Sequence, residues 1–201
     1  MPRLEFFFDC SSPWTYLAFT RIGAIAARTQ AEIVWRPILV GGVFNAVNKE
    51  IYQLRANPNP RKAHYQAKDL RDWAQICGIR IGQPPVFPVR AVAAMRAVIA
   101  ADEQDALVPF ARATFEAYWG DLKDISEPRI LLEIASRVGL AGDALLARSG
   151  DAEIKSRLFA NTEEVIARGG FGSPTMFVDG DDMYFGNDRL PLVQAALERR
   201  L

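Results

Sequence analysis

Residues 6–17 read Phe-Phe-Phe-Asp-Cys-Ser-Ser-Pro-Trp-Thr-Tyr-Leu. The apolar residues 6–8 predict the end of a buried strand, residues 9–12 are rich in turn and N-cap types, and Pro13 suits the first helical position. Apolar residues then recur at helical spacing, at Trp14, Tyr16, Leu17, Phe19, Ile22 and Ile25. Ser12 is therefore expected at a helix N-terminus, where free N–H groups and the dipole favour an anion. Taken alone, such a serine indicates no more than an N-cap.

Composition limits the classes of protein that the chain can represent. It has 201 residues, 50% of them hydrophobic, enough for one large domain or one domain with an insertion. The 24 basic and 24 acidic residues give a net charge of zero, which argues against a nucleic-acid partner or a basic membrane surface. With no membrane-spanning run and no signal-peptide pattern, we expect a soluble, cytoplasmic protein. Cys10 and Cys77 lack metal-like spacing, so they predict two free thiols and no metal site.

Strands are expected near both ends of the chain. Apolar and β-branched runs predict four of them, at residues 4–8, 32–36, 175–178 and 183–185. The first two flank the helix expected at 13–28, which makes a β-α-β unit and implies a parallel pair. The last two are joined at Asp179-Gly180, a hairpin turn, and a turn at 186–188 opens a final helix.

The middle of the chain is expected to be helical. Gly41-Gly42 breaks the pattern, so residues 40–60 are interpreted as irregular apart from a turn of helix at 44–49. Apolar spacing predicts helices at about 61–78, 89–101, 103–119, 126–138, 141–148 and 151–168. The first of these carries Tyr65, Leu70, Trp73 and Ile76 on one face. Because so many helices cannot all cover a four-stranded sheet, residues 41–168 are expected to form an inserted helical domain, and residues 1–40 plus 169–201 the sheet domain.

This order of elements resembles the thioredoxin-like oxidoreductases of the disulfide-bond-A type. It implies an α/β thioredoxin-like fold with a large all-helical insertion. In redox members the first turn reads Cys-Pro-x-Cys, whereas here it reads Ser12-Pro13-Trp14-Thr15, so disulfide exchange at this turn is chemically unavailable. Ser173-Pro174 resembles the cis-proline loop of that fold, which would lie beside the active turn.

Seven short pieces resemble, more narrowly, the 2-hydroxychromene-2-carboxylate isomerases and the related kappa-class glutathione transferases. They are Phe8-Asp-x-x-Ser-Pro-x-x-Tyr-Leu17, Trp35-Arg-Pro37, Gly42-Val-Phe44 followed by Asn48-Lys49, Pro60-Arg-Lys-x-x-Tyr65, Asp69-Leu-x-x-Trp-Ala74, Phe171-Gly-x-Pro-Thr-Met-Phe177 and Phe185-Gly-Asn-Asp-Arg-Leu190. Each piece alone is weak, but together, in the same order, they are specific and cover nearly the whole chain.

The resemblance implies glutathione as the cofactor. Ser12 would be the catalytic hydroxyl, donating to the glutathione sulfur and lowering the pKa of its thiol. The Ser173 backbone would pair with the cysteinyl part of glutathione, as a strand adds to a sheet edge. The other cofactor-binding positions that it implies are Trp14, Asn48, Phe185, Gly186, Asn187 and Asp188.

The implied reaction is isomerisation of 2-hydroxychromene-2-carboxylate, or a related aromatic enone, by reversible thiolate addition. The electrophile would lie against Trp14, Phe44 and Phe87, with Asn57 and Lys62 as candidates near its anionic group. Phe87 stands where the isomerase pattern implies a tyrosine. A homodimer is a further family expectation. Two alternatives stay open, a kappa-like transferase that conjugates electrophiles and a non-catalytic thioredoxin-like binding protein.

Overall fold

The computed structural model describes residues 1–200 and contains a single four-stranded sheet within them, in the order β2-β1-β3-β4. β1 and β2 are parallel, whereas β1–β3 and β3–β4 are antiparallel. The strands are β1 (Arg3–Phe8), β2 (Glu32–Pro37), β3 (Thr175–Val178) and β4 (Asp182–Phe185). Each begins and ends within one residue of the predicted bounds, so the predicted strands and the parallel first pair are confirmed.

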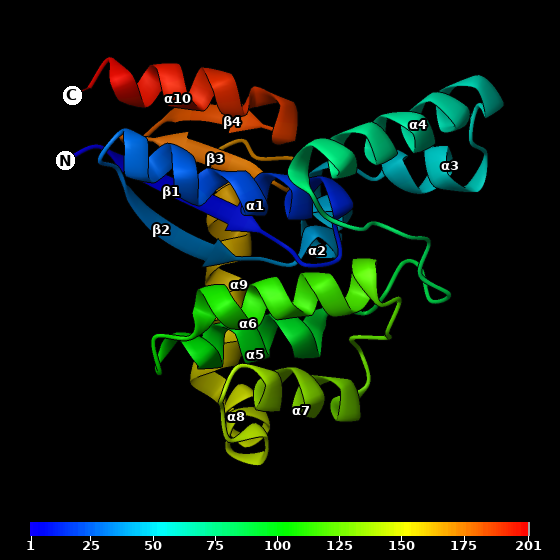
Figure 1. Cartoon of the computed structure of the whole chain (residues 1–201), viewed down its shortest axis with the longest axis vertical. Helices are drawn as coiled ribbons and strands as arrows, with labels where there is room; N and C mark the ends of the chain where they lie inside the picture. Colours follow the sequence, from blue (N-terminus) through cyan, green and yellow to red (C-terminus); the bar gives the residue numbers. More distant parts are fainter. Residues whose placement is uncertain (201) are drawn as a thin grey trace.

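Helices form most of the rest of the described chain (Figure 1). They are α1 (Pro13–Arg28), α2 (Val40–Val47), α3 (Glu50–Ala56), α4 (Pro60–Cys77), α5 (Val92–Asp102), α6 (Leu107–Phe115), α7 (Pro128–Arg137), α8 (Gly142–Ser149), α9 (Ala152–Ala167) and α10 (Leu190–Glu198), with a π-helical turn η1 (Glu116–Gly120) and a 3-10 turn η2 (Asn187–Arg189). None of the helices within residues 1–200 is both long and apolar enough to cross a bilayer.

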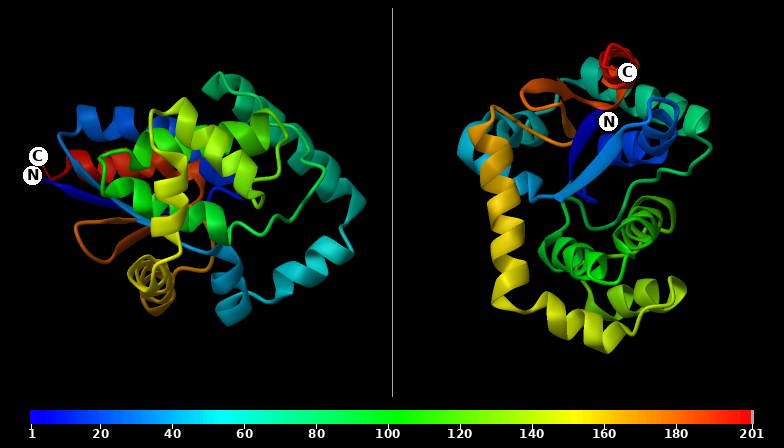
Figure 2. Two further views of the ribbon diagram at one scale, coloured as in Figure 1. Left: turned by 90° about the horizontal axis from the view of Figure 1, so that it is seen from below. Right: turned by 90° about the vertical axis from the view of Figure 1, so that its left-hand side faces the viewer.

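The two faces of the sheet have different partners because successive side chains of a strand point to opposite sides. Leu4, Phe6 and Phe8 belong to the main hydrophobic core, together with side chains of α1 and α10 and of the helical block. Phe7 and Phe177 point the other way, 5.6 Å apart between ring centroids, into a smaller cluster that includes α9. In the right-hand view of Figure 2, α9 runs along the side of the molecule from the helical block to the sheet.

Residues 40–56 form two helices, so the irregular region predicted there is wrong. Gly42 lies within α2, and a Cβ at this position would come within 3.1 Å of the Thr162 side chain on α9. The glycine thus serves close helix–helix packing and does not break the chain. The neighbouring α3 has no buried residue.

Helix α4 forms where it was predicted, but its apolar face is only partly covered. Ala74 is its sole buried residue, whereas Tyr65 is 63% and Ile76 71% exposed. Figure 1 shows α3 and α4 extending away from the sheet, and α4 packs back onto α1. Of the predicted face, Leu70 and Trp73 are half-buried, and the Arg21 guanidinium of α1 lies 5.1 Å from the Trp73 ring centroid. Helical spacing alone could not show that this face is only partly covered.

The helical block and the sheet share one continuous core. The Phe115 ring of α6 lies 5.1 Å from Phe19 on α1 and 6.5 Å from Phe8 on β1. Beyond Phe115 the predicted single helix 103–119 turns π-helical, and the buried Trp119 donates from Nε1 to the Cys10 carbonyl at 3.0 Å. The predicted division into residues 41–168 and the remainder stays a prediction.

Candidate functional site

The turn after β1 opens helix α1, as the sequence predicts. Ser12 is the N-cap, with extended backbone dihedrals, and its Oγ accepts a hydrogen bond from the Thr15 backbone N–H at 3.2 Å. Pro13 is the first helical residue and has no N–H to satisfy. Ser12 is 8% exposed, and that exposed part faces a cavity.

The loop before β3 is hydrogen-bonded to this turn through Ser173. The Ser173–Pro174 peptide bond is cis, as predicted. The Ser12 hydroxyl donates to the Ser173 carbonyl at 3.1 Å. The Ser173 hydroxyl accepts from the Asp9 N–H at 3.0 Å and lies 2.8 Å from Thr15 Oγ1. We call Asp9, Ser12, Thr15 and Ser173 the turn wall.

Asp9 joins this turn to helix α2. Its buried carboxylate accepts from the Ser11 and Val40 backbone N–H groups, both at 2.8 Å. Burial raises the pKa of the Asp9 carboxyl, and these two hydrogen bonds oppose that rise. Val40 is the first residue of α2, so the carboxylate lies at the positive end of that helix.

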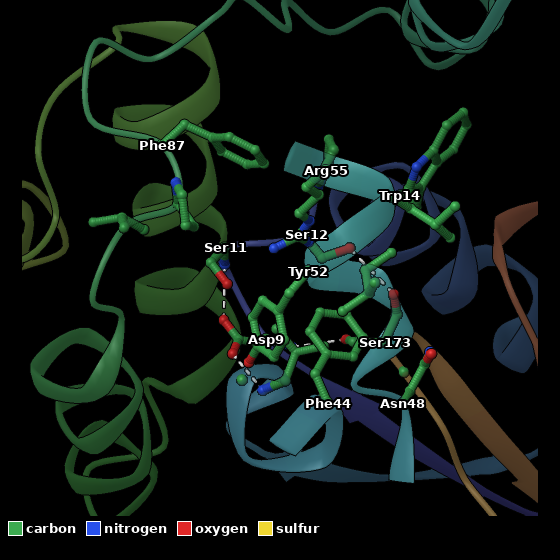
Figure 3. Close-up of a pocket in the computed structure, with 18 of the residues that line it drawn as sticks. Asp9, Ser11, Ser12, Trp14, Phe44, Asn48, Tyr52, Arg55, Phe87 and Ser173 are labelled. Atoms are coloured by element: carbon green, nitrogen blue, oxygen red, sulfur yellow. Dashed lines mark hydrogen bonds between the residues drawn. The ribbon is translucent and has the colours of Figure 1, made fainter. Parts of the chain in front are cut away.

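Asp9, Ser12 and Ser173 of the turn wall line one side of a cavity of about 1230 Å³. The opposite side comes from α2, α3, the start of α4 and the segment before α5. Its prominent side chains, which we call the aromatic wall, are Phe44, Tyr52, Arg55 and Phe87. Figure 3 labels side chains of both walls around this cavity, among them Asp9, Ser12 and Ser173 of the turn wall and Phe44, Tyr52, Arg55 and Phe87 of the aromatic wall.

Arg55 is held by aromatic rings. Its guanidinium carbon lies 5.2 Å from the Phe44 ring centroid and 5.6 Å from that of Phe87. The guanidinium therefore lies between α2 and the segment before α5, within the aromatic wall. Within the described residues it has rings as neighbours and no carboxylate partner, so its charge is available to an anion.

Comparisons with known proteins agree with this geometry. The family model of the DSBA-like thioredoxin domain matches residues 3–198. The 2-hydroxychromene-2-carboxylate isomerase of Sphingobium xenophagum is 31% identical over 206 residues, covering 96% of this chain and 97% of that protein. The chain belongs to the 2-hydroxychromene-2-carboxylate isomerase family, within the DSBA-like thioredoxin proteins.

Two further relatives match along nearly the full length of this isomerase-family chain. A solved structure of 2-hydroxychromene-2-carboxylate isomerase superposes with a TM-score of 0.83 at 25% identity, covering 98% of this chain and 95% of that one. Human glutathione S-transferase kappa 1 is 29% identical over 208 residues, covering 96% of this chain and 90% of the transferase. The thioredoxin-like fold with a helical insertion is thereby confirmed.

Most of the residues singled out in this isomerase-family sequence line this same cavity. They are Ser12, Trp14, Phe44, Asn48, Asn57, Lys62, Phe87, Ser173 and Phe185. Asn48 caps the C-terminus of α2, and its side-chain amide donates to the Phe171 carbonyl at 3.2 Å. The structure thus brings these side chains together, while the role of each stays a prediction.

Gly186, Asn187 and Asp188 do not line this cavity. Asp188 is exposed and pairs with Arg189 at 2.6 Å. Asn187 is 3% exposed, and its Oδ1 has no hydrogen-bond partner within residues 1–200. Gly186 has a φ of +97°, a left-handed conformation that favours glycine. The cofactor-binding role predicted for these three residues stays a prediction.

Four members of the two walls, Asp9, Thr15, Tyr52 and Arg55, were not singled out as site residues. Asp9 and Thr15 lie inside the decisive stretch but were interpreted as parts of the turn, and Tyr52 and Arg55 lie in a region interpreted as irregular. Arg55 belongs to none of the motifs. The helical spacing of residues 50–56 is the sequence signal that could have placed it on a helix. Among the described residues, no group of three or more His, Cys, Asp or Glu side chains is placed to hold a metal ion.

Proposed function

We propose that the chain is a glutathione-dependent isomerase. Its substrate would be 2-hydroxychromene-2-carboxylate, giving trans-o-hydroxybenzylidenepyruvate, or a related aromatic enone. The observation that supports this most directly is the Ser12 hydroxyl, which caps α1 and faces a large cavity with aromatic side chains opposite. The family supports it too, because its members include isomerases and glutathione transferases. The proposal includes a homodimer in the cytoplasm.

Unpaired backbone groups in the site fit a peptide thiol. The backbone N–H groups of Ser173 and Trp14 have no hydrogen-bond partner within residues 1–200. Ser173 is 7% exposed, and an unpaired N–H at such a position is costly. An extended peptide such as glutathione would satisfy the Ser173 N–H by strand-like pairing. The Trp14 N–H, at the start of α1, favours a thiolate nearby.

Residues of the two walls would have different roles in the reaction. When bound, glutathione supplies a thiolate that adds reversibly to the enone, so that the former double bond can rotate before the thiolate leaves. Ser12 donates a hydrogen bond to the sulfur and lowers the thiol pKa. Arg55 faces negative charge that develops on the electrophile. Phe44 and Phe87 hold its aromatic ring.

The remaining site residues would fix the ends of the two ligands. Asn48, Phe185, Gly186, Asn187 and Asp188 are proposed to hold the γ-glutamyl half of glutathione. The unpartnered, buried Oδ1 of Asn187 supplies an acceptor next to that region. Trp14 would pack against both glutathione and the electrophile. Asn57 and Lys62, which also line the cavity, would contact the electrophile's anionic group.

A second candidate is a kappa-like transferase, in which the conjugate is released. It is favoured by Phe87, whose ring lacks the hydroxyl that the isomerase pattern implies at this position. The two reactions are separated by the mass of the product, because isomerisation leaves the substrate mass unchanged and conjugation adds one glutathione.

Calorimetric titration with reduced glutathione tests the cofactor, on wild type, on Asp188→Ala and on the exposed control Asp72→Ala. Binding that weakens in Asp188→Ala alone supports the site. The absorbance of a chromene carboxylate, followed with and without glutathione, then tests the reaction. No glutathione binding at millimolar concentration would refute both enzymatic functions and leave the non-catalytic binding protein.

A further inference from the structure

The Ser12 hydroxyl has no proton free for a ligand in this structure. A hydroxyl carries one proton and two acceptor positions. Its proton goes to the Ser173 carbonyl at 3.1 Å, and one acceptor position is taken by the Thr15 N–H at 3.2 Å. To donate to a sulfur in the cavity, the hydroxyl must turn away from Ser173.

Turning away would leave the Ser173 carbonyl without a donor. Among residues 1–200, the Ser12 hydroxyl is the one group that donates to it. Ser173 is 7% exposed, so water does not readily replace the lost bond. The hydroxyl is therefore held in its present orientation until another donor reaches this carbonyl.

The loop itself does not need to move. The Ser173 side chain is held independently, by the Asp9 N–H at 3.0 Å and by Thr15 Oγ1 at 2.8 Å. These two bonds fix Ser173 against the turn whatever the Ser12 hydroxyl does. A rotation about one side-chain bond of Ser12 is the only change required.

Ser173 offers a peptide both of the groups that strand-like pairing uses. Its N–H has no partner within residues 1–200, and its carbonyl is held by a side chain that can rotate away. A ligand residue whose carbonyl accepts from this N–H presents its own N–H to the Ser173 carbonyl. The ligand amide then takes the place of the Ser12 hydroxyl on Ser173.

We infer that this exchange of donors on the Ser173 carbonyl activates the site for peptide thiols. The cysteinyl amide of the cofactor replaces the Ser12 hydroxyl on Ser173, and the freed hydroxyl turns to the sulfur. When a thiol has no amide N–H at this position, the Ser12 hydroxyl stays bonded to the Ser173 carbonyl, and the pKa of that thiol is not lowered by Ser12. The inference rests on the proposed function. It implies that Ser12 activates only thiols whose molecule has a peptide N–H placed to bond the Ser173 carbonyl.

The test compares glutathione with its ester analogue, in which an oxygen replaces the cysteinyl N–H. The pKa of each bound thiol is measured from ultraviolet thiolate absorbance against pH, on wild type and on Ser12→Ala. Ser12→Gly provides a second variant without the hydroxyl, because glycine is also tolerated at an N-cap. Binding of S-methylglutathione checks that each variant keeps its site.

In wild type, we expect the glutathione thiol pKa to lie lower than that of the ester by about one unit or more. In Ser12→Ala and Ser12→Gly, the two thiols should have the same pKa. The ester should bind about tenfold more weakly than glutathione, because one hydrogen bond is lost.

Other outcomes overturn the inference in distinguishable ways. Equal lowering of both thiol pKa values in wild type, lost in both serine variants, would show that the hydroxyl reaches sulfur without exchange, while the proposed function stands. If the ester bound more than about a thousandfold more weakly than glutathione, the Ser12 hydroxyl could not be donating to the Ser173 carbonyl in the ester complex, which would contradict the inference. No lowering of either thiol pKa in wild type would refute the thiolate step of the proposed function as well.

Discussion

The turn wall and the aromatic wall face each other across one cavity, but their side chains are held in different ways. In the turn wall, Ser12 and Ser173 are buried and joined to their neighbours by short hydrogen bonds. In the aromatic wall, Arg55 and Phe87 are exposed and held by ring contacts. Hydrogen bonds fix donor and acceptor positions closely, whereas ring contacts tolerate changes of shape. The first wall suits a constant cofactor, and the second a variable electrophile.

The largest effect is expected from removing the hydroxyl of the turn wall. Ser12→Ala should lower glutathione-dependent turnover by about 100-fold or more, since a lost donor at the reacting atom has this size of effect. Glutathione affinity, measured by calorimetry, should change only a few-fold. Unchanged turnover would remove the functional distinction between the walls and leave Ser12 as a simple cap.

A smaller effect is expected in the aromatic wall. Arg55→Met should raise KM for an anionic aromatic electrophile by about tenfold to a hundredfold, the size expected for a lost hydrogen bond between charged groups. Glutathione affinity should not change. Arg61→Met is the control, because Arg61 lies on α4 outside the main cavity. Equal changes in KM for Arg55→Met and Arg61→Met would mean that Arg55 acts only through the protein's overall positive charge and not through a direct contact with the electrophile.

The hydrogen bonds of the turn wall should also contribute to stability. The Ser11 and Val40 backbone N–H groups donate to different oxygens of the Asp9 carboxylate, so Asp9→Asn keeps one acceptor and places an amide NH2 against the other N–H. Unfolding in urea should show a loss of about 1–3 kcal/mol. The control Asp72→Asn, in an exposed pair with Lys68, should lose less than about 0.5 kcal/mol. Similar losses for both would mean that the turn wall is not tightly held.

Titration of Asp9 predicts a modest dependence on pH. Its pKa is raised in the folded chain, so the folded state binds this proton more tightly than the unfolded state. The resulting stabilisation is complete below the ordinary pKa of 3.8 and is lost as pH rises through the folded value. Wild type should therefore gain stability relative to Asp9→Asn as pH falls through this window. If the difference in unfolding free energy between wild type and Asp9→Asn instead became smaller as pH falls, the two N–H bonds would lower the Asp9 pKa by more than burial raises it.

The smallest effect concerns Cys10, which lies next to the turn wall. It is fully buried, and burial raises the pKa of its thiol well above the usual value. Cys10→Ala should leave glutathione-dependent turnover unchanged within about twofold, because such a thiol is unreactive. Cys77→Ala, at the end of α4, is the matched control. A loss of turnover in Cys10→Ala but not in Cys77→Ala would mean that the Cys10 thiol takes part in the reaction.

The turn wall was largely predictable from sequence because its signals are local. Ser12 and Pro13 predicted the first residue of α1 correctly, since an N-cap serine followed by proline fixes a helix start. The apolar runs that predicted β1 and β3 are local signals of the same kind. The placement of Ser173 beside Ser12 came from the family resemblance, because the two lie 161 residues apart.

The aromatic wall was only partly predictable because it depends on contacts between distant segments. Phe44 and Phe87 were singled out, but Tyr52 and Arg55 were missed with α3 itself. Gly42 indicated a break, whereas its hydrogen side chain allows α2 to approach Thr162. Such a contact appears only when α9, more than a hundred residues away in the chain, is in place.

The hydrogen bond from the Trp119 indole to the Cys10 carbonyl, at 3.0 Å, affects how parts can be exchanged between relatives. It is a direct link from the helical block to the backbone of the turn that carries Ser12. A chimera that takes its helical block from a relative without an indole at this position would lose a donor to a buried carbonyl. Recombination of the two parts should therefore preserve function only when the donor block brings its own tryptophan.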